Sequence, residues 1–116
     1  DTTITLDFAL HRLTEVIKNL IVYPKNMVNN LNKFKGLYNS QAVLIALTQK
    51  GISREKAYEL VQRNAMKTWD KGTEFIDEIK SDAEISSLLS ERNIDDIFSS
   101  ESHLEHVDYI FSRVLN

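Results

Sequence analysis

The sequence predicts an all-helical fold, and three observations support this prediction. The 116 residues include only three glycines and one proline, so few positions interrupt regular structure. Apolar residues recur at intervals of three and four, which is the period of an amphipathic helix. No segment shows the two-residue alternation of a half-buried strand, and no internal repeat is visible.

The first predicted helix runs through the N-terminal residues and ends near Val22. Its apolar stripe consists of residues that step by four, three, four and three: Leu6, Leu10, Leu13, Ile17 and Leu20. A stripe of this kind requires a partner helix along its length. Further apolar residues widen the stripe and predict burial on more than one side in a bundle: Ile4, Phe8, Val16 and Ile21. Outside such a bundle, the helix is expected to associate with copies of itself.

Pro24 begins the next predicted element. Proline fits the first turn of a helix, and it disfavours helical geometry at Tyr23 before it. Residues 25–35 are polar and rich in asparagine, and they predict a short helix with Met27, Val28 and Leu31 on one face. Gly36 then interrupts the pattern, so we expect a domain boundary around residues 32–37.

Capping residues predict the next two helices. Ser40 is expected to cap a helix that reaches about Lys50, and Gly51 supplies the left-handed position after it. Ser53 is expected to cap a helix that ends at Gly72. The residues of this second helix that are predicted to point inward are Ala57, Leu60, Val61, Ala65 and Trp69.

The C-terminal part is predicted to form shorter helices. Thr73, Asp82 and Ser90 are plausible caps for three of them. The last helix is predicted to run roughly from Ser102 to Leu115.

Composition limits the cellular setting and the chemistry. The chain has no cysteine, which excludes disulfides and thiolate sites within it. Its longest strictly apolar run, Ala42 to Leu47, is far below the roughly 18 residues that a membrane span requires. No signal-peptide pattern opens the chain, so the sequence favours a soluble, cytoplasmic protein. Asp1 is not an initiator methionine and apolar periodicity has begun by Ile4, so we expect a fragment of a longer polypeptide.

Charge is unevenly distributed. Residues 1–73 hold 11 Lys/Arg against 6 Asp/Glu, whereas residues 74–116 hold 3 against 11, and the net charge is −3. The acidic C-terminal part is unsuited to a nucleic-acid backbone, which requires a basic face. Solvated helix faces are the simplest explanation of the charges.

The candidates for chemistry are few. His103 and His106 lie three residues apart among carboxylates, a spacing that can place both on one helix face beside a metal. This spacing is common, so we predict a structural or surface role for them and for His11. The neighbouring pairs Asp77/Glu78 and Asp95/Asp96 point apart on a helix, which disfavours joint acid–base catalysis. There is no glycine-rich phosphate loop. No catalytic, cofactor-binding or metal-binding residue is therefore predicted.

Residues 46–57 also have the outline of a DNA-binding helix-turn-helix, with Gly51 in the turn. The second helix of this motif carries four basic residues: Arg54, Lys56, Arg63 and Lys67. However, Glu55 and Glu59 lie near its N-terminal end, where they would repel phosphate. A helical hairpin used only for packing has the same outline and is the preferred interpretation. Trp69 is similarly interpreted as a core residue rather than a stacking platform.

Four blocks of sequence carry a family resemblance. They are LIVYPKNMVNNL at 20–31, GLYNSQAVLIAL at 36–47, KGISREKAYELVQRNAMKTW at 50–69 and HLEHVDYIF at 103–111. In this order and spacing they resemble the end of bacterial-type adenylosuccinate lyases. Ala42 stands where that family usually has arginine, and Lys25 where glutamate is common, so a local salt bridge of the family is in question.

The resemblance implies an all-helical, tetrameric enzyme of the fumarase/aspartase superfamily, with long central helices and a small C-terminal domain. Residues 1–32 would be the end of the last central helix and its exit, and residues 33–116 the C-terminal helical domain. The intact enzyme would eliminate fumarate from adenylosuccinate, giving AMP, and from the succinyl-carboxamide ribotide of purine biosynthesis. No cofactor is implied. The implied partners are the rest of the polypeptide and the other subunits of a homotetramer.

The working residues of that family do not carry over to this chain. Its acid–base histidine, its signature-loop serine and its substrate-binding Ser and Arg residues belong to motifs that would precede Asp1. None of the three histidines lies in such a motif, so the chain is expected to be structural and inactive alone, with substrate bound mainly by other segments. Two alternatives remain open: a helix-turn-helix DNA-binding protein, and a helical interaction module that docks through its first helix.

Overall fold

The computed structural model describes residues 1–115, except for the side chain of residue 102. This part of the chain consists of helices and turns without strands, which confirms the all-helical fold. Residue 116, the end of the second predicted domain, lies outside the described residues. The helices are α1 (Thr2–Lys18), α2 (Pro24–Asn32), η1 (Leu37–Asn39), α3 (Ser40–Gln49), α4 (Arg54–Lys71), α5 (Phe75–Ser81), α6 (Ala83–Leu88), α7 (Glu91–Phe98), η2 (Ser100–His103) and α8 (Val107–Leu115).

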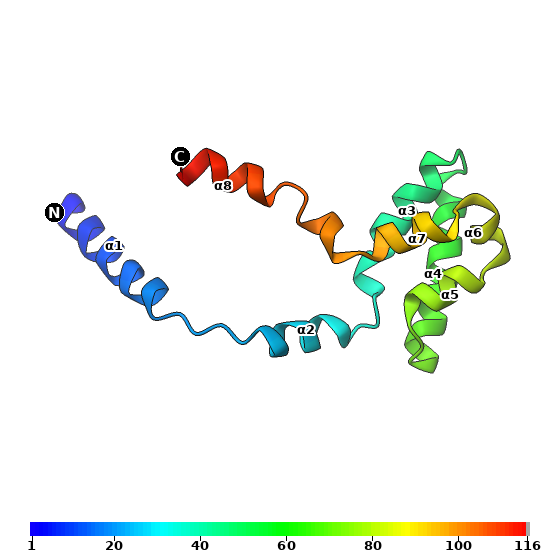
Figure 1. Cartoon of the computed structure of the whole chain (residues 1–116), viewed down its shortest axis with the longest axis horizontal. Coiled ribbons are helices and arrows are strands. Elements are labelled where there is room, and N and C mark those ends of the chain that lie inside the picture. The colour runs from blue at the N-terminus through cyan, green and yellow to red at the C-terminus, as the bar shows by residue number, and fades with distance from the viewer. Residues whose placement is uncertain (116) are drawn as a thin grey trace.

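The chain divides into a compact unit, residues 37–98, and two arms (Figure 1). The N-terminal arm comprises residues 1–36 and the C-terminal arm residues 99–115, and both extend from the same side of the unit. The radius of gyration is 20.3 Å, whereas a compact chain of this length would have about 13 Å. The arms account for this difference, because they reach outward without folding back onto the unit.

The core lies entirely in the compact unit. Helices α3 and α4 form an antiparallel hairpin, and α5, α6 and α7 pack around it. The buried apolar residues are Val43, Leu47, Ala57, Leu60, Val61, Phe75, Ile79, Ile85, Leu89 and Ile94. Residues 46–57, which were predicted to form a helical hairpin used for packing, do form the turn of the hairpin between α3 and α4.

One prediction for the inward face of α4 was wrong. Ala57, Leu60 and Val61 are buried and Ala65 is half-buried, but the side chain of Trp69 is 69% exposed. The inward positions continue from Asn64 to Thr68, a step of four, and both of these residues are buried. Trp69 follows Thr68 by one residue and is therefore rotated about 100° away from the core.

Several predicted helix ends are confirmed. The Ser53 hydroxyl accepts a hydrogen bond from the Lys56 amide at 3.2 Å, and Asp82 and Ser90 cap α6 and α7 through their side chains. Gly51 and Gly72 both have positive φ, as a left-handed position after a helix requires.

Two predicted caps were wrong. Ser40 lies inside α3, because the 3₁₀ turn η1 runs directly into this helix and leaves no open end at Ser40. Helix α5 is preceded by Glu74 rather than Thr73. The Thr73 hydroxyl instead donates to Glu78 Oε1 at 2.9 Å.

The helices of the arms are shorter than predicted. Helix α1 ends at Lys18 rather than near Val22, and the Asn19 side chain closes it by donating to the Glu15 carbonyl at 2.8 Å. Residues 20–23 lie outside regular structure, and Pro24 disfavours helical geometry at Tyr23 directly before it. The single helix expected from Ser102 to Leu115 is divided into η2 and α8 by a turn at residues 104–106.

Candidate functional site

The three histidines do not form a chemical site. His11 lies exposed on α1, His103 ends η2 and His106 lies in the turn before α8. His103 Nε2 lies 3.4 Å from Asn39 Oδ1, and its ring is near that of Tyr38. Among the described residues, no group of three or more His, Cys, Asp or Glu side chains is placed to hold a metal ion.

Asp82 is the centre of a polar network inside the compact unit. Its side chain is buried. Its Oδ1 accepts from the amides of Glu84 and Ile85 at the start of α6. Its Oδ2 accepts from Asn64 Nδ2 at 2.7 Å and from an Arg63 guanidinium nitrogen at 2.8 Å. This carboxylate therefore joins α4 to α6 through both of its oxygens.

The environment of Asp82 keeps it ionised. Burial raises the pKa of the Asp82 carboxyl, but the hydrogen bonds from Asn64 and Arg63 lower it, and the resulting pKa lies below its usual value. A carboxylate whose two oxygens are occupied by protein donors is poorly suited to accept a substrate proton. The network is therefore structural, since it holds α4 and α6 together.

The basic residues of the possible DNA-recognition helix are partly engaged in the same region. Arg63 contacts Glu84 as well as Asp82, and Lys56 Nζ lies 3.2 Å from Glu84 Oε2. These two cations thus face carboxylates of their own chain. A phosphate backbone would have to compete with those carboxylates for the same side chains.

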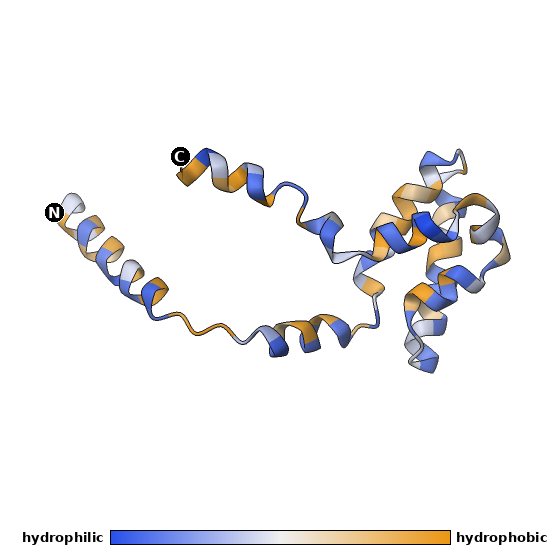
Figure 2. Cartoon of the chain, in the orientation of Figure 1, coloured by the Kyte–Doolittle hydropathy of each residue, from blue (hydrophilic) through white to orange (hydrophobic). Residues whose placement is uncertain are grey.

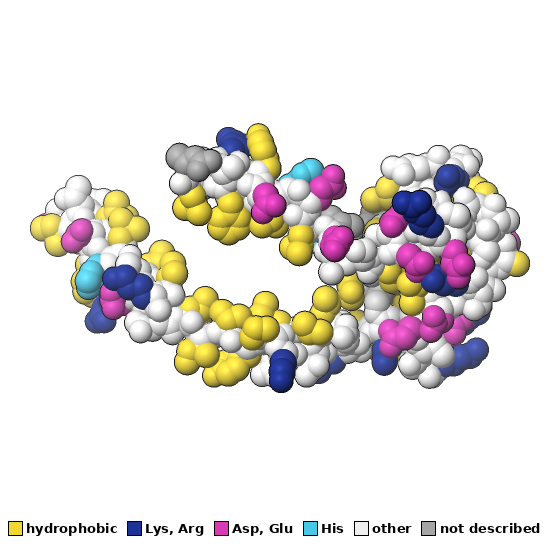
Figure 3. Space-filling view, in the orientation of Figure 1, with side chains coloured by type: hydrophobic (Ala, Val, Ile, Leu, Met, Phe, Trp, Pro, Cys, Tyr) yellow, Lys and Arg dark blue, Asp and Glu magenta, His cyan; other side chains and the backbone are white. Residues whose placement is uncertain are grey.

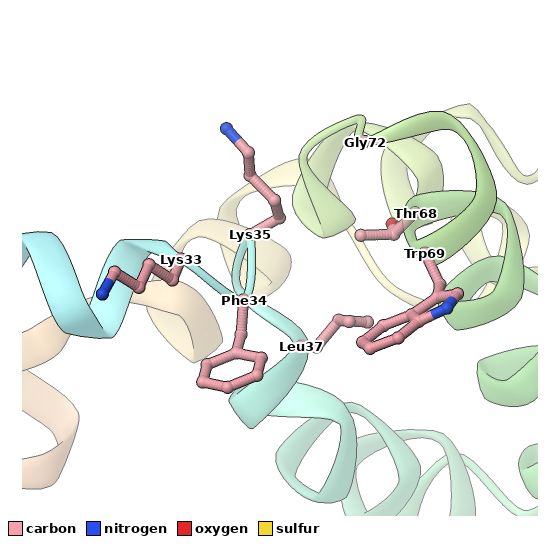
Figure 4. A pocket seen from close by; sticks show the side chains of 7 residues that line it. All are labelled: Lys33, Phe34, Lys35, Leu37, Thr68, Trp69 and Gly72. Atoms are coloured by element: carbon pink, nitrogen blue, oxygen red, sulfur yellow. The ribbon is translucent and has the colours of Figure 1, made fainter.

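A pocket of about 270 Å³ lies where the N-terminal arm meets the compact unit, and we call it the Trp69 pocket. Figure 4 shows the side chains of Phe34, Leu37 and Trp69 around it, with the amino groups of Lys33 and Lys35 directed away. Its lining residues are Lys33, Phe34, Lys35, Leu37, Thr68, Trp69 and Gly72. The walls are thus mostly apolar, and the charges lie at the rim.

The loop beside this pocket is held by specific interactions. Lys35 has a φ of 52°, the one positive value among described residues other than glycine. Its carbonyl accepts from the Phe75 amide at 2.9 Å, and its Nζ lies 2.9 Å from Glu74 Oε1. Thr68, on the other side, is buried, and its hydroxyl has no hydrogen-bond partner within the described part of the chain.

The arms present a second candidate surface. Hydrophobic and hydrophilic residues alternate along each of their helices (Figure 2), and in Figure 3 apolar groups line the sides of the two arms that face the open space between them. Helices α1, α2 and α8 bury no residue. The predicted stripe is exposed: Leu6, Leu10, Leu13 and Ile17 lie on α1, and Leu20 lies just beyond its end. In the described residues, no helix is long and apolar enough to cross a membrane.

Sequence reasoning missed the main features of these sites. Asn64 and Asp82 are 18 residues apart, and no local pattern relates them. The Trp69 pocket was missed because Trp69 had been assigned to the core. The sequence carried no warning, because Val61, Ala65 and Trp69 also step by four, and the buried positions Asn64 and Thr68 are polar.

The fold and its surfaces define an all-helical domain with a structural polar network and two arms whose apolar faces are not covered by any described residue. The chain belongs to the family described as "Adenylosuccinate lyase C-terminus", whose model matches residues 36–114. It is also 44% identical over 113 residues to a protein of Staphylococcus saprophyticus subsp. saprophyticus named adenylosuccinate lyase. That match includes 97% of this chain and 26% of the relative, so the chain spans about a quarter of the relative's length. The family resemblance of the four sequence blocks is confirmed.

Proposed function

We propose that this chain is the C-terminal part of an adenylosuccinate lyase and serves it structurally. The 44% identity across 97% of the chain carries the proposal. In this role the chain belongs to a cytoplasmic, homotetrameric enzyme of purine biosynthesis. That enzyme eliminates fumarate from adenylosuccinate, giving AMP, and from the succinyl-carboxamide ribotide.

The division of the chain is part of the same proposal. Residues 1–32 form the end of the last central helix and its exit, and residues 33–116 form the C-terminal helical domain. Two observations support this division: the family match begins at residue 36, and residues 1–32 contribute no buried side chain. The apolar stripe of α1 then packs in the central bundle of the assembled enzyme.

The elimination requires a base that removes a proton next to a carboxylate and an acid that assists the departing nitrogen. The described residues offer no such pair, since Asp82 is occupied by protein donors and the histidines lie apart. The catalytic and substrate-binding residues are therefore assigned to segments outside this chain. No residue of this chain is assigned to cofactor or metal binding.

A chimera tests the proposal directly. In the S. saprophyticus relative, the segment matched by this chain is replaced by residues 1–116, and conversion of adenylosuccinate is followed by ultraviolet absorbance. We expect the chimera to form a tetramer and release fumarate, whereas the isolated chain releases none. A chimera that is folded and tetrameric but inactive would contradict a shared role, and fumarate release by the isolated chain would contradict the structural assignment.

The exposed stripe of α1 favours a second candidate, a helical interaction module. Its four apolar residues are each more than half exposed: Leu6, Leu10, Leu13 and Ile17. Analytical ultracentrifugation of the isolated chain at increasing concentration tests this candidate, with Leu10→Lys/Leu13→Lys as the comparison. Self-association that the double variant abolishes would support it and would also agree with a helix taken from a bundle. A monomer at all concentrations would contradict it.

A further inference from the structure

The Trp69 pocket exposes two aromatic rings that no described residue covers. The side chains of Phe34 and Trp69 are 58% and 69% exposed. Large aromatic residues that flank a pocket are the typical anchor points of protein interfaces. The pocket thus has the aromatic lining that is typical of a protein–protein contact site.

The pocket is preformed. The Lys35 carbonyl is tied to the Phe75 amide, and Lys35 pairs with Glu74, so the loop that carries Phe34 is fixed to the start of α5. Trp69 is in the last turn of α4, which ends at Gly72. Both walls are therefore attached to the compact unit, and an occupant would not need to order them.

The size of the pocket favours a side chain over a free metabolite. Ligand pockets commonly measure about 300–1,000 Å³, and the Trp69 pocket measures about 270 Å³. This volume is sufficient for one large apolar side chain. A nucleotide or another molecule of drug size would extend far beyond the walls.

The surroundings indicate the chemistry of the occupant. Val28, Leu31 and Phe34 follow each other at intervals of three, so the exposed apolar face of α2 leads toward the pocket. Lys33 lines the pocket, and Lys71 directly precedes the lining residue Gly72 in the chain. Neither lysine forms an ion pair with another described residue. A segment that extends along α2 into the pocket would gain from a carboxylate near these amino groups.

We propose that the Trp69 pocket is an anchor site, which receives one large apolar side chain, flanked by a carboxylate, from the lyase polypeptide outside this chain. This inference rests on the proposed function. About three quarters of the S. saprophyticus relative lies outside the matched segment, which supplies the occupant. The continuity between the pocket and the α2 face places both in one interface.

The first test compares Trp69→Ala with Tyr58→Ala in the chimera and in the isolated chain. Tyr58 is a matched control, because it lies on the same helix, is 57% exposed and does not line the pocket. We expect Trp69→Ala to lower the thermal midpoint of the chimera by several degrees and to leave that of the isolated chain unchanged. Tyr58→Ala should change neither. No effect of Trp69→Ala on the chimera, or an equal loss in both proteins, would overturn the proposal.

The second test uses Trp69 as a probe, since it is the only tryptophan of the chain. Any tryptophan in the part of the chimera that comes from the relative is replaced by phenylalanine, and acrylamide quenching of the Trp69 fluorescence is measured. We expect strong quenching in the isolated chain and a severalfold weaker effect in the chimera, as the occupant covers the ring. Equal quenching would overturn the proposal.

The third test concerns charge. Lys33→Glu should lower the thermal midpoint of the chimera, whereas Lys50→Glu, the same change at an exposed position after α3, should not. Equal changes of the thermal midpoint from Lys33→Glu and Lys50→Glu would show that the occupant of the pocket carries no carboxylate near Lys33. Lyase activity of the unmodified chimera tests the proposed function separately, so an active chimera with an unresponsive pocket would refute the anchor site alone.

Discussion

The compact unit and the arms are built from the same kind of helix, but among the described residues the buried side chains belong to the compact unit. Helix α4 buries five residues, including Leu60 and Thr68, whereas α1, α2 and α8 bury none. Helices α2 and α8 have nine residues each, and isolated helices shorter than about 12–15 residues are marginal in water. The comparison teaches that an amphipathic pattern specifies a helix but does not ensure that its apolar face is buried, because no described residue covers that face in the arms.

The largest expected effect on the free energy of unfolding is the difference between a mutation in the compact unit and one in the N-terminal arm. Phe75 is fully buried in the compact unit, and Phe75→Ala should lower the free energy of unfolding by about 3–5 kcal/mol through lost burial and a cavity. Leu13→Ala, at a 53% exposed position of α1, should change it by less than about 0.5 kcal/mol in the isolated chain. Urea denaturation followed by circular dichroism measures both. A comparable loss from Leu13→Ala would show that the arm folds onto the unit in solution.

The next largest effect concerns the polar network around Asp82 and its contribution to stability at low pH. Asp82→Ala removes the acceptor for Arg63, Asn64 and two amides, and should lower the free energy of unfolding by about 2–3 kcal/mol. The pKa of Asp82 is lowered in the folded chain, because hydrogen bonds from Asn64 and Arg63 outweigh the opposing effect of burial. The unfolded chain therefore binds the proton more readily.

The pH dependence follows from that difference. The stabilisation from Asp82 is fully present above its unfolded-state pKa of about 3.9 and is lost as the pH falls through the lower folded-state pKa. Thermal unfolding from neutral pH to pH 3 should show that wild type loses more stability in acid than Asp82→Asn does. Parallel pH curves for the two proteins would contradict the ionised network. The helices of the arms do not contact Asp82, so their loss of helicity should not follow the acid-induced unfolding of the compact unit.

The smallest effect tests single caps inside the compact unit. Ser53→Ala removes the hydroxyl that accepts from the Lys56 amide, and should lower the free energy of unfolding by about 1 kcal/mol. Ser40→Ala is the matched control, since Ser40 lies within α3 and caps nothing. Thermal unfolding of the two variants measures the difference. Equal losses would indicate that Ser40 contributes an N-terminal interaction after all.

The sequence predicted the features that depend on local patterns. The spacing of Leu60 and Val61, the cap at Asp82 and the positive φ at Gly51 each follow from neighbours within a few residues, and all are observed. Ser40 and Trp69 were assigned wrongly for related reasons. The 3₁₀ turn before Ser40 and the outward direction of Trp69 depend on how the arm joins the unit, which is tertiary information.

The candidate sites were less accessible to prediction. The bond between Asn64 and Asp82 joins α4 to the start of α6, and it exists only because α5 turns the chain back. The Trp69 pocket likewise requires residues 33–37 to lie against the end of α4. Periodicity identifies faces within one helix, but it contains no information about which faces meet across such distances.

Gly36 connects the two arms. It ends the N-terminal arm, and a β-carbon built on it would lie 3.2 Å from a ring carbon of Phe98, the last residue before the C-terminal arm. The Phe98 ring in turn rests against the ring of Phe75, with the ring centroids 5.7 Å apart. The two arms therefore leave the compact unit at neighbouring points, where Gly36 lies close to two tilted rings, and a side chain larger than hydrogen at Gly36 would press on Phe98 at the root of the other arm.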